Sequence, residues 1–537
     1  MTDNIKKNLP EPPPAYRWIV LIFISLAMFG NYYIYDTISP LADLLVSQLK
    51  FTDSDIGLLQ GIYSIPNILM VLIGGLVIDR IGTKRASLIF STLCMLGAFF
   101  TVIKGDIYWM AAGRLIFGLG AESLIVAITT VIARWFKGKE LSFAFGLNLT
   151  IARLGSFAAL NSPSWGKNLY LNWQDPLWVA FGAGVISVIS VIIFFVLDKI
   201  ATGKYTLGKE GNQDQINFRE ILKFNKSFWL ITLLCVTFYS AMFPFQTFAV
   251  KFFIGKHFSQ IPSGMGRSLG SFLSSILTLS AMILTPLFGL LADKIGKRAT
   301  LMMFGSILII PVYLAMNYIH IDGKIPEDTL KSVYLYEEIL KENTLKFNEM
   351  LSELIPEGVN ENEFMKKPDY QKRLAEYSIN MQNEIDSLKM TSKSSVVIKN
   401  NKLDYTSKKS MGFGEILKYY YNLVAILILY FPNLLIPMIL MGISFSLVPA
   451  VMWPSVALII KADRLGTAYG LMTMIQNIGL AGFNILIGTV NDASGGYSAG
   501  MWLFSTLGFF GFAFAFLLKK ADKSAGGHGL ENVKVNE

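Results

Sequence analysis

Two side chains of opposite charge, Glu122 and Arg153, stand inside long apolar stretches of the sequence. The short polar segment 135–140 separates the two stretches, which predicts a pair of antiparallel helices. At a helical rise of about 1.5 Å per residue, the roughly thirteen residues between each charge and this segment put both charges about 20 Å from it. Ionised groups this deep in apolar surroundings are costly and usually mark a functional site.

A guanidinium and a carboxylate at one depth suit a zwitterionic ligand. Arg153 can bind a carboxylate through two parallel hydrogen bonds, and Glu122 can accept hydrogen bonds from an ammonium group. The alternative is a permanent ion pair that only orients the two helices. Both interpretations can be true at once if the ion pair is closed in the empty protein and opens around a ligand. Arg114, two turns before Glu122, could serve an outer gate or proton handling, or could extend to a membrane interface.

Other polar and aromatic side chains in the apolar stretches are weaker candidates, because aromatic residues there more often serve packing or the membrane interface. Asn31, Asn67 and Gln246 are among them. With Glu122 and Arg153, the predicted substrate-binding set contains Tyr35, Asp36, Tyr63, Tyr239, Trp453, Gln476 and Asn477.

The apolar stretches are too many for a soluble core. The chain is 53% hydrophobic and 16% charged, whereas a soluble domain carries about 25% charged residues. A helix that spans a membrane needs about 20 mostly apolar residues. Twelve such segments are predicted near residues 17–39, 56–79, 86–104, 107–135, 141–163, 176–197, 227–252, 268–292, 299–318, 430–460, 465–490 and 497–518.

Several function classes are disfavoured. The only cysteines, Cys94 and Cys235, and the three scattered histidines give neither a disulfide scaffold nor a metal site. The net charge of +9 is explained by cytoplasmic loops, so we expect no nucleic-acid partner. No nucleophile–base pair or phosphate loop occurs at usable spacing. We therefore expect no enzyme activity, catalytic residue, metal or cofactor.

Lysines and arginines gather in alternate connecting segments, which predicts that both termini lie inside the cell. The helices then form two halves of six, joined by a long cytoplasmic loop. The predicted parts are a tail over 1–16, a bundle over 17–197, the loop 198–226, a second bundle over 227–318 and 430–518, an extracytoplasmic insertion over 319–429, and a tail over 519–537.

A short element with a glycine, an aspartate and basic residues occurs twice, at 75–85 and at 289–298, each time closing the second helix of a half. Two halves of the same orientation make alternating access to a central site feasible. The carboxylates of Asp79 and Asp293 could form links that break and re-form as the halves move. They could instead only anchor the topology. The predicted gating residues are Asp79, Arg80, Asp293, Lys294 and Arg114.

The insertion 319–429 is polar and rich in lysine and glutamate. Parts of it have heptad spacing, which predicts a helical hairpin packed along an apolar seam. A disordered loop is the alternative, given the high charge. The predicted seam consists of Val333, Leu340, Phe347, Leu354, Tyr370, Leu374, Tyr377, Met381 and Leu388.

The block around Glu122 and Arg153 resembles the major facilitator superfamily domain-containing protein 1 family. The resemblance covers nearly all helices and implies an all-α major facilitator fold of twelve helices in two bundles. It also implies facilitated transport of dipeptides, with Glu122 and Arg153 gripping the dipeptide termini. The matching segments are Gly113-Arg114-Leu-Ile-Phe-Gly118-Leu-Gly120-Ala-Glu122, Ala152-Arg153-Leu-Gly155-Ser156, Tyr35-Asp36, Phe243-Pro244-Phe245, Trp453-Pro454, Tyr469-Gly470 and Gln476-Asn477.

Two features depart from that family. Residues 1–16 lack the acidic dileucine sorting signal of the animal members, so we expect a bacterial inner membrane in place of a lysosome. The insertion 319–429 is not part of the family pattern. Animal members use an accessory subunit on the lumenal side, and an accessory protein could bind here on the corresponding side. We expect a monomer otherwise.

Two other functions stay open. One is a proton-coupled transporter of organic anions or drugs. A substrate with only a carboxylate would need Arg153 but should tolerate Glu122→Gln. The second is a membrane receptor or scaffold that does not transport and binds a partner through the insertion. Such a protein would need neither the paired gate elements nor charges at mid-membrane depth.

Overall fold

The computed structural model describes most of the chain. The described residues are 10–136, 140–207, 224–259, 261, 263–319, 325, 344, 347–348, 350–351, 355, 361–387, 394–399, 402–407, 413–461, 464–524 and 530–531. In this part of the chain, twelve helical segments are long and apolar enough to cross a membrane. The prediction of an all-α membrane protein with twelve spans is therefore confirmed.

The first half contains helices of widely different length. Its first two spans are interrupted, since α1 is followed by short helices and α3 is separated from α4 by a turn at Ile62 and Tyr63. Its elements are α1 (Pro14–Asp36), η2 (Ser39–Leu41), α2 (Ala42–Leu49), α3 (Asp53–Gly61), α4 (Ser64–Ile81), α5 (Thr83–Ile103), α6 (Ile107–Trp135), α7 (Leu141–Leu160), α8 (Ser162–Trp165), η3 (Lys167–Leu171) and α9 (Gln174–Lys204).

Two glycines let the helices of this half approach closely. A Cβ atom at Gly155 of α7 would overlap the backbone oxygen of Phe29 in α1. A Cβ atom at Gly118 of α6 would overlap the carbonyl oxygen of Tyr63 in the turn between α3 and α4. Helices in lipid have no hydrophobic driving force for association, so they depend on close packing. Small residues at such crossings allow that packing. The close approaches at Gly155 and Gly118 bring Arg153 and Tyr63 toward the interior of this half.

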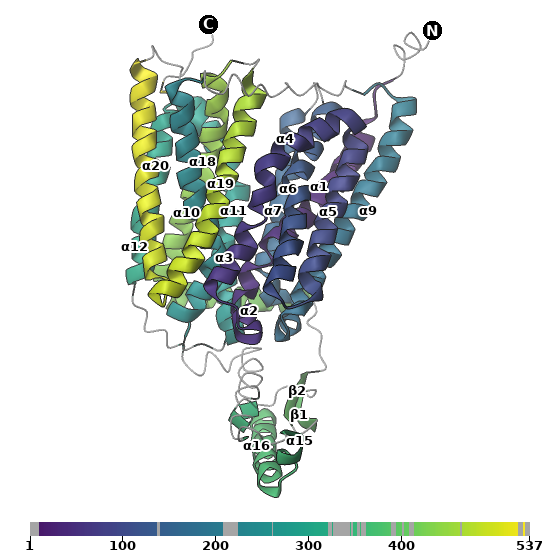
Figure 1. Cartoon of the computed structure of the whole chain (residues 1–537), viewed down its shortest axis with the longest axis vertical. Coiled ribbons are helices and arrows are strands. Elements are labelled where there is room, and N and C mark those ends of the chain that lie inside the picture. The colour runs from purple at the N-terminus through teal and green to yellow at the C-terminus, as the bar shows by residue number, and fades with distance from the viewer. Residues whose placement is uncertain are drawn as a thin grey trace. The chain divides into compact units, whose positions relative to one another are not determined.

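The second half repeats the pattern with six long helices, several of which contain proline. Phe245, Tyr313 and Phe504 join three of these helices, with ring centroids 5.1–6.2 Å apart. Figure 1 shows α10, α18, α19 and α20 gathered beside α12. The six are α10 (Lys226–Lys256), α11 (Ser263–Ile295), α12 (Arg298–Tyr318), α18 (Pro432–Ile459), α19 (Leu465–Ser494) and α20 (Ser498–Ser524).

A second compact unit comprises residues 253–269 and 321–431. It contains α15 (Glu361–Phe364), α16 (Pro368–Ser387), β1 (Ser394–Lys399), β2 (Lys402–Ser407) and α17 (Phe413–Tyr430). The two strands pair antiparallel, with Lys399 opposite Lys402. This β-hairpin lies beyond the predicted apolar seam and was not predicted, although the β-branched residues on either side of Asn400 and Asn401 are a recognised hairpin signal.

Part of the predicted seam lies in one apolar cluster of this unit. The rings of Phe347 and Tyr377 stack, with centroids 3.7 Å apart and planes 2° from parallel. The cluster also holds Tyr370, Leu374 and Met381. The helical hairpin as a whole stays a prediction, because four seam residues lie outside the described residues. They are Val333, Leu340, Leu354 and Leu388.

The predicted tails and the loop between the halves are described only in part. Helix α9 continues to Lys204 and α10 begins at Lys226, so much of 198–226 lies outside the described residues. Near the C-terminus, Leu530 is buried, and its carbonyl accepts a hydrogen bond from the Arg298 backbone N–H at 2.5 Å. The Glu531 carboxylate accepts a hydrogen bond from the Thr300 N–H at 2.9 Å. This contact caps the first turn of α12.

Candidate functional site

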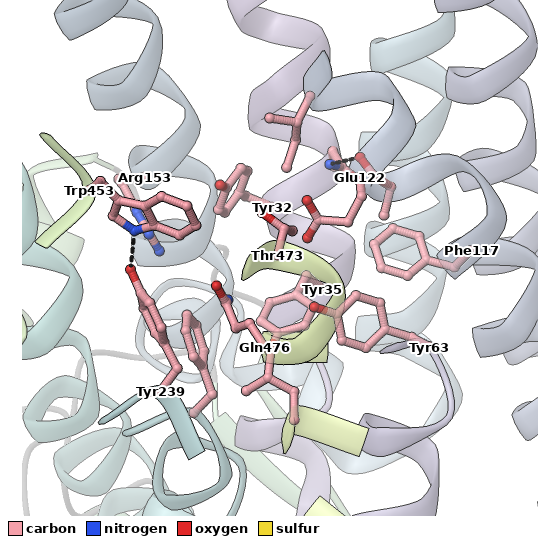
Figure 2. Close-up of a pocket in the computed structure, with 15 residues that line it drawn as sticks. Tyr32, Tyr35, Tyr63, Phe117, Glu122, Arg153, Tyr239, Trp453, Thr473 and Gln476 are labelled. Carbon is pink, nitrogen blue, oxygen red and sulfur yellow. Dashed lines mark hydrogen bonds between the residues drawn. The ribbon is translucent and has the colours of Figure 1, made fainter. Parts of the chain in front are cut away.

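A cavity of about 260 Å³ lies among helices of both halves. Helices α1, α6 and α7 and the turn between α3 and α4 line it from the first half, and α10, α18 and α19 from the second. Seven of its fifteen lining residues are aromatic, and five others carry polar or charged groups (Figure 2). The lining residues are Asn31, Tyr32, Tyr35, Tyr63, Phe117, Ala121, Glu122, Ile125, Arg153, Tyr239, Phe243, Trp453, Thr473, Gln476 and Leu480.

Glu122 and Arg153 both line this cavity but do not pair. Within the part of the chain that the structure describes, neither side chain forms an ion pair. Figure 2 shows them on opposite sides of Tyr32. The Arg153 guanidinium lies 5.1 Å from the ring centroid of Tyr32 and 5.8 Å from that of Phe445. The alternative of a permanent ion pair is therefore not the arrangement seen here, and both charges are available to a ligand.

Aromatic contacts fix the remaining walls. The Trp453 indole N–H donates a hydrogen bond to the Tyr239 hydroxyl at 2.9 Å. Tyr239 stacks on Phe243, with ring centroids 5.5 Å apart. On the other side, the rings of Tyr35 and Tyr63 meet edge to face at 4.9 Å. These contacts hold large apolar surfaces and several hydroxyl groups around the two charges.

Seven of the nine residues in the predicted substrate-binding set line the cavity, and two do not. Asp36 lines a separate, smaller cavity with Gln60 and Gln246. Asn477 is fully buried, and its amide donates to the Thr473 carbonyl of its own helix at 3.0 Å. Of the weaker candidates, Asn31 lines the main cavity, whereas Asn67 is buried and is not among its lining residues.

Several lining residues were missed by sequence reasoning. They are Tyr32, Phe117, Ala121, Ile125, Phe243, Thr473 and Leu480. Helical spacing carries a signal for some of them. Thr473 and Leu480 lie three residues before and four after Gln476, and Tyr32 lies three residues before Tyr35. Extending each candidate by one helical turn would have found them.

Arg114 is buried near the site and links the ends of two helices through hydrogen bonds. Its side chain is 1% exposed, so it does not extend to a membrane interface. Its guanidinium donates hydrogen bonds to the carbonyl of Ile34 at 3.0 Å, the carbonyl of Leu59 at 3.2 Å and the side-chain oxygen of Gln60 at 2.8 Å. These acceptors lie near the ends of α1 and α3. Arg114 thereby ties together the two segments that present Tyr35 and Tyr63 to the cavity.

The predicted cytoplasmic gating residues lie at helix ends. Asp79 and Arg80 are exposed at the end of α4, and Lys294 is exposed at the end of α11. Asp293 pairs with Arg298 of its own repeated element at 2.5 Å. Among the described residues, neither carboxylate forms a hydrogen bond or ion pair with the other half, and their gating role stays a prediction.

A buried ionic cluster near the same membrane side was missed. Asp198 of α9 is fully buried, and its carboxylate lies 3.0 Å from the Lys84 ammonium and 3.3 Å from the Arg134 guanidinium. The Trp135 indole N–H also donates to it, at 2.9 Å. Lys84 belongs to the first copy of the repeated element. The basic end of that element is therefore held by a carboxylate of the last helix of its own half.

The two halves are joined at the opposite, predicted extracytoplasmic end. The Asp492 carboxylate of α19 accepts hydrogen bonds from the backbone N–H groups of Asp53 at 2.9 Å and Ser54 at 2.7 Å. Lys251 of α10 forms an ion pair with Asp53. Asp492 thus caps the N-terminus of α3 across the boundary between the halves. Helix α19 is also close enough that a Cβ atom at Gly57 would overlap its backbone.

In the described ranges, no group of three or more histidine, cysteine, aspartate or glutamate side chains could hold a metal ion. The polar groups around the cavity fit an organic ligand with both charges.

The family model described as Major Facilitator Superfamily matches residues 24–322. The lysosomal dipeptide transporter MFSD1 of Danio rerio is 27% identical over 495 residues, covering 89% of this chain and 82% of that protein. The human protein of the same name is 26% identical over 496 residues, covering 90% of this chain and 81% of its own length.

Two further matches are more distant. A hexuronate transporter of Escherichia coli K12 is 22% identical over 229 residues, covering 40% of this chain and 52% of that protein. Among solved structures, the nucleoside transporter NupG superposes with a TM-score of 0.60 at 13% identity, covering 94% of this chain and 99% of its own. The likeness to NupG shows the fold alone.

Proposed function

This chain belongs to the Major Facilitator Superfamily and is a multi-pass membrane transporter, and on that premise we propose that it carries dipeptides or similar small zwitterions. The observation that supports this proposal is the pair of unpaired, opposite charges, Glu122 and Arg153, in one cavity. The similarity to proteins named lysosomal dipeptide transporter, over about nine tenths of the chain, agrees with it.

The two charges suit the two ends of a peptide. Arg153 binds the carboxylate through its planar guanidinium, which can form two parallel hydrogen bonds. Glu122 accepts hydrogen bonds from the ammonium group. The volume of about 260 Å³ lies just below the range of about 300–1,000 Å³ that is usual for drug-sized ligands. The aromatic walls then contact the peptide side chains.

Transport follows from exposure of this cavity to each side in turn. We propose that the closure at Asp492 and Asp53 opens when the halves rock, and that Asp79 and Asp293 then form the cytoplasmic links. We propose facilitated uniport, in which the substrate gradient alone drives the movement. The bacterial inner membrane stays the predicted location, although the relatives MFSD1 are named lysosomal.

Uptake into liposomes tests the proposal. Purified protein is reconstituted, and uptake of a labelled mixture of dipeptides is measured for wild type, Glu122→Gln and Arg153→Lys. We expect saturable uptake by wild type and a loss of at least about tenfold in each variant, since a lost charged hydrogen bond costs about 1.5–3 kcal/mol.

Matched controls make the same chemical changes on exposed positions of α16. Glu376→Gln and Arg373→Lys alter side chains that lie far from the cavity in sequence and belong to the second unit. Both should transport like wild type. A folded wild-type protein that takes up no dipeptide would rule the proposal out.

A second candidate, a transporter of organic anions, draws on the similarity to a hexuronate transporter over part of the chain. An anion without an ammonium group needs Arg153 but not the charge of Glu122. Transport that survives Glu122→Gln and is abolished by Arg153→Lys would favour this candidate. A dependence of uptake on an inward proton gradient would further point to proton coupling.

A further inference from the structure

Helix α17 (Phe413–Tyr430) is strongly apolar for part of an otherwise polar insertion. Only two of its 18 residues are charged, Glu415 and Lys418, both near its N-terminus. Helix α16 of the same unit has six charged residues among 20. Helices α16 and α17 therefore have opposite solvent preferences.

The two sides of α17 differ in burial but not in polarity. The buried side carries Tyr419, Leu423, Ile426 and Leu427. The other side is exposed and equally apolar, with Leu417 at 53%, Tyr421 at 75% and Ile428 at 54% exposure. Spacings of four and seven residues place these three side chains on one face of the helix. An apolar stripe thus runs along the helix without a protein partner among the described residues.

Contacts inside the unit place the end of α17 beside the residues that connect two candidate spans. The unit includes residues 253–269, which connect α10 to α11, and both of these helices are candidate spans. Phe431, the residue after α17, packs edge to face against Phe258 of this connection, with ring centroids 5.1 Å apart. The next residue, Pro432, begins the candidate span α18. The end of α17 therefore adjoins the ends of three spans.

We propose that α17 lies in the extracytoplasmic interface of the bilayer, with Leu417, Tyr421 and Ile428 in contact with lipid acyl chains. A helix that exposes an uncharged apolar face partitions in this way, and tyrosine favours the interface. On the span α18 that follows in the chain, Ile436 and Ile439 are likewise exposed, at 57% and 44%. Lipid contact along α17 anchors the insertion to the membrane.

Spin labels on single cysteines test this assignment in liposomes. The chain has only Cys94 and Cys235, both buried, so a background with serine at these positions is practical. Labels are placed through Leu417→Cys, Tyr421→Cys and Ile428→Cys, and collisions are measured with oxygen, which concentrates in lipid, and with a water-soluble nickel chelate. We expect high oxygen and low nickel accessibility at all three positions.

Three control positions calibrate the measurement. Ile379→Cys on α16 replaces a side chain that is 60% exposed and reports on water, and Phe509→Cys within the span α20 replaces one that is 57% exposed and reports on lipid. Leu423→Cys reports on the buried side of α17. Because the three test side chains are exposed, their replacement leaves the packing intact, and a wild-type elution profile identifies folded variants.

Each other outcome overturns the proposal. Nickel accessibility like that at Ile379 would show that the stripe faces water. Low accessibility to both reagents, as at Leu423, would show that a protein partner or a second copy of the chain covers it.

Discussion

At the scale of single residues, the site keeps the opposite charges of Glu122 and Arg153 apart, although an ion pair between them would have a lower free energy. An ionised side chain at mid-membrane depth costs about 2.5–3.5 kcal/mol or more. The aromatic faces next to the Arg153 guanidinium return part of that cost, since a cation over a ring contributes about 0.5–2 kcal/mol. Among the residues that the structure describes, none makes a comparable contact with Glu122. A ligand that brings both opposite charges would compensate each group, which is why the separation favours a zwitterion.

The hydrogen bond between Trp453 and Tyr239 offers a test of the aromatic wall. We expect Tyr239→Phe and Trp453→Phe each to raise the KM for dipeptide uptake about fivefold, because a neutral hydrogen bond contributes about 1 kcal/mol. Uptake at a series of substrate concentrations measures the change.

The double variant of these two residues separates their effects. If the hydrogen bond is the shared cause, the double variant should resemble either single variant and not the product of both. Fully multiplicative effects would show that each ring contacts the substrate independently of the bond.

At the scale of elements, helix ends carry the links between the halves. Asp492 accepts backbone hydrogen bonds from the first residues of α3, where the unsatisfied N–H groups and the helix dipole both favour a carboxylate. The ion pair between Lys251 and Asp53 adds a second link. Both links depend on geometry that is lost as soon as α3 and α19 separate, so they suit a closure that must open.

Removal of the Asp492 charge should weaken this closure. We expect Asp492→Asn to favour the state that is open to the extracytoplasmic side. Loss of charged hydrogen bonds worth about 1.5–3 kcal/mol corresponds to a shift of about tenfold or more in the equilibrium. A Thr473→Cys substitution in the cavity reports the shift through its labelling rate with a thiol reagent that does not cross the membrane.

Asp55→Asn is the matched control for this change. Asp55 also lies at the start of α3, but it forms a capping box with Thr52 inside the first half. It should leave the labelling of the cavity unchanged. Equal labelling in wild type and Asp492→Asn would show that this carboxylate does not hold the halves together.

At the scale of the whole molecule, the lysine and arginine distribution predicts which ends of the helices face the cytoplasm. Cysteines that replace Lys372 on α16 and Lys520 at the end of α20 test it. We expect the first to react with an impermeant thiol reagent added to intact cells, and the second to react only after the membrane is opened. Labelling of both in intact cells, or the reverse order, would contradict the predicted topology.

The sequence predicted the twelve spans and the depth of Glu122 and Arg153, because both follow from hydropathy and from a constant rise per residue. The sequence also identified the family, because the motif around these two residues is continuous in the chain. It did not separate Tyr35 from its neighbour Asp36, which lines another cavity. Nor did it exclude Asn477, which follows the lining residue Gln476. Adjacent residues on a helix point about 100° apart, and only the packed structure shows which of the two faces the cavity.

What the sequence alone determined is therefore local and periodic: a membrane chain, two repeated halves, and two charges at one depth. Tertiary structure decided whether those charges pair, which carboxylates hold the halves, and where Arg114 lies. Asp492 and Asp53 are more than 400 residues apart in the chain, and Asp198 reaches Lys84 and Arg134 from another helix. Such contacts depend on how helices rotate and tilt against one another, which is settled by the packing of side chains from many distant segments at once.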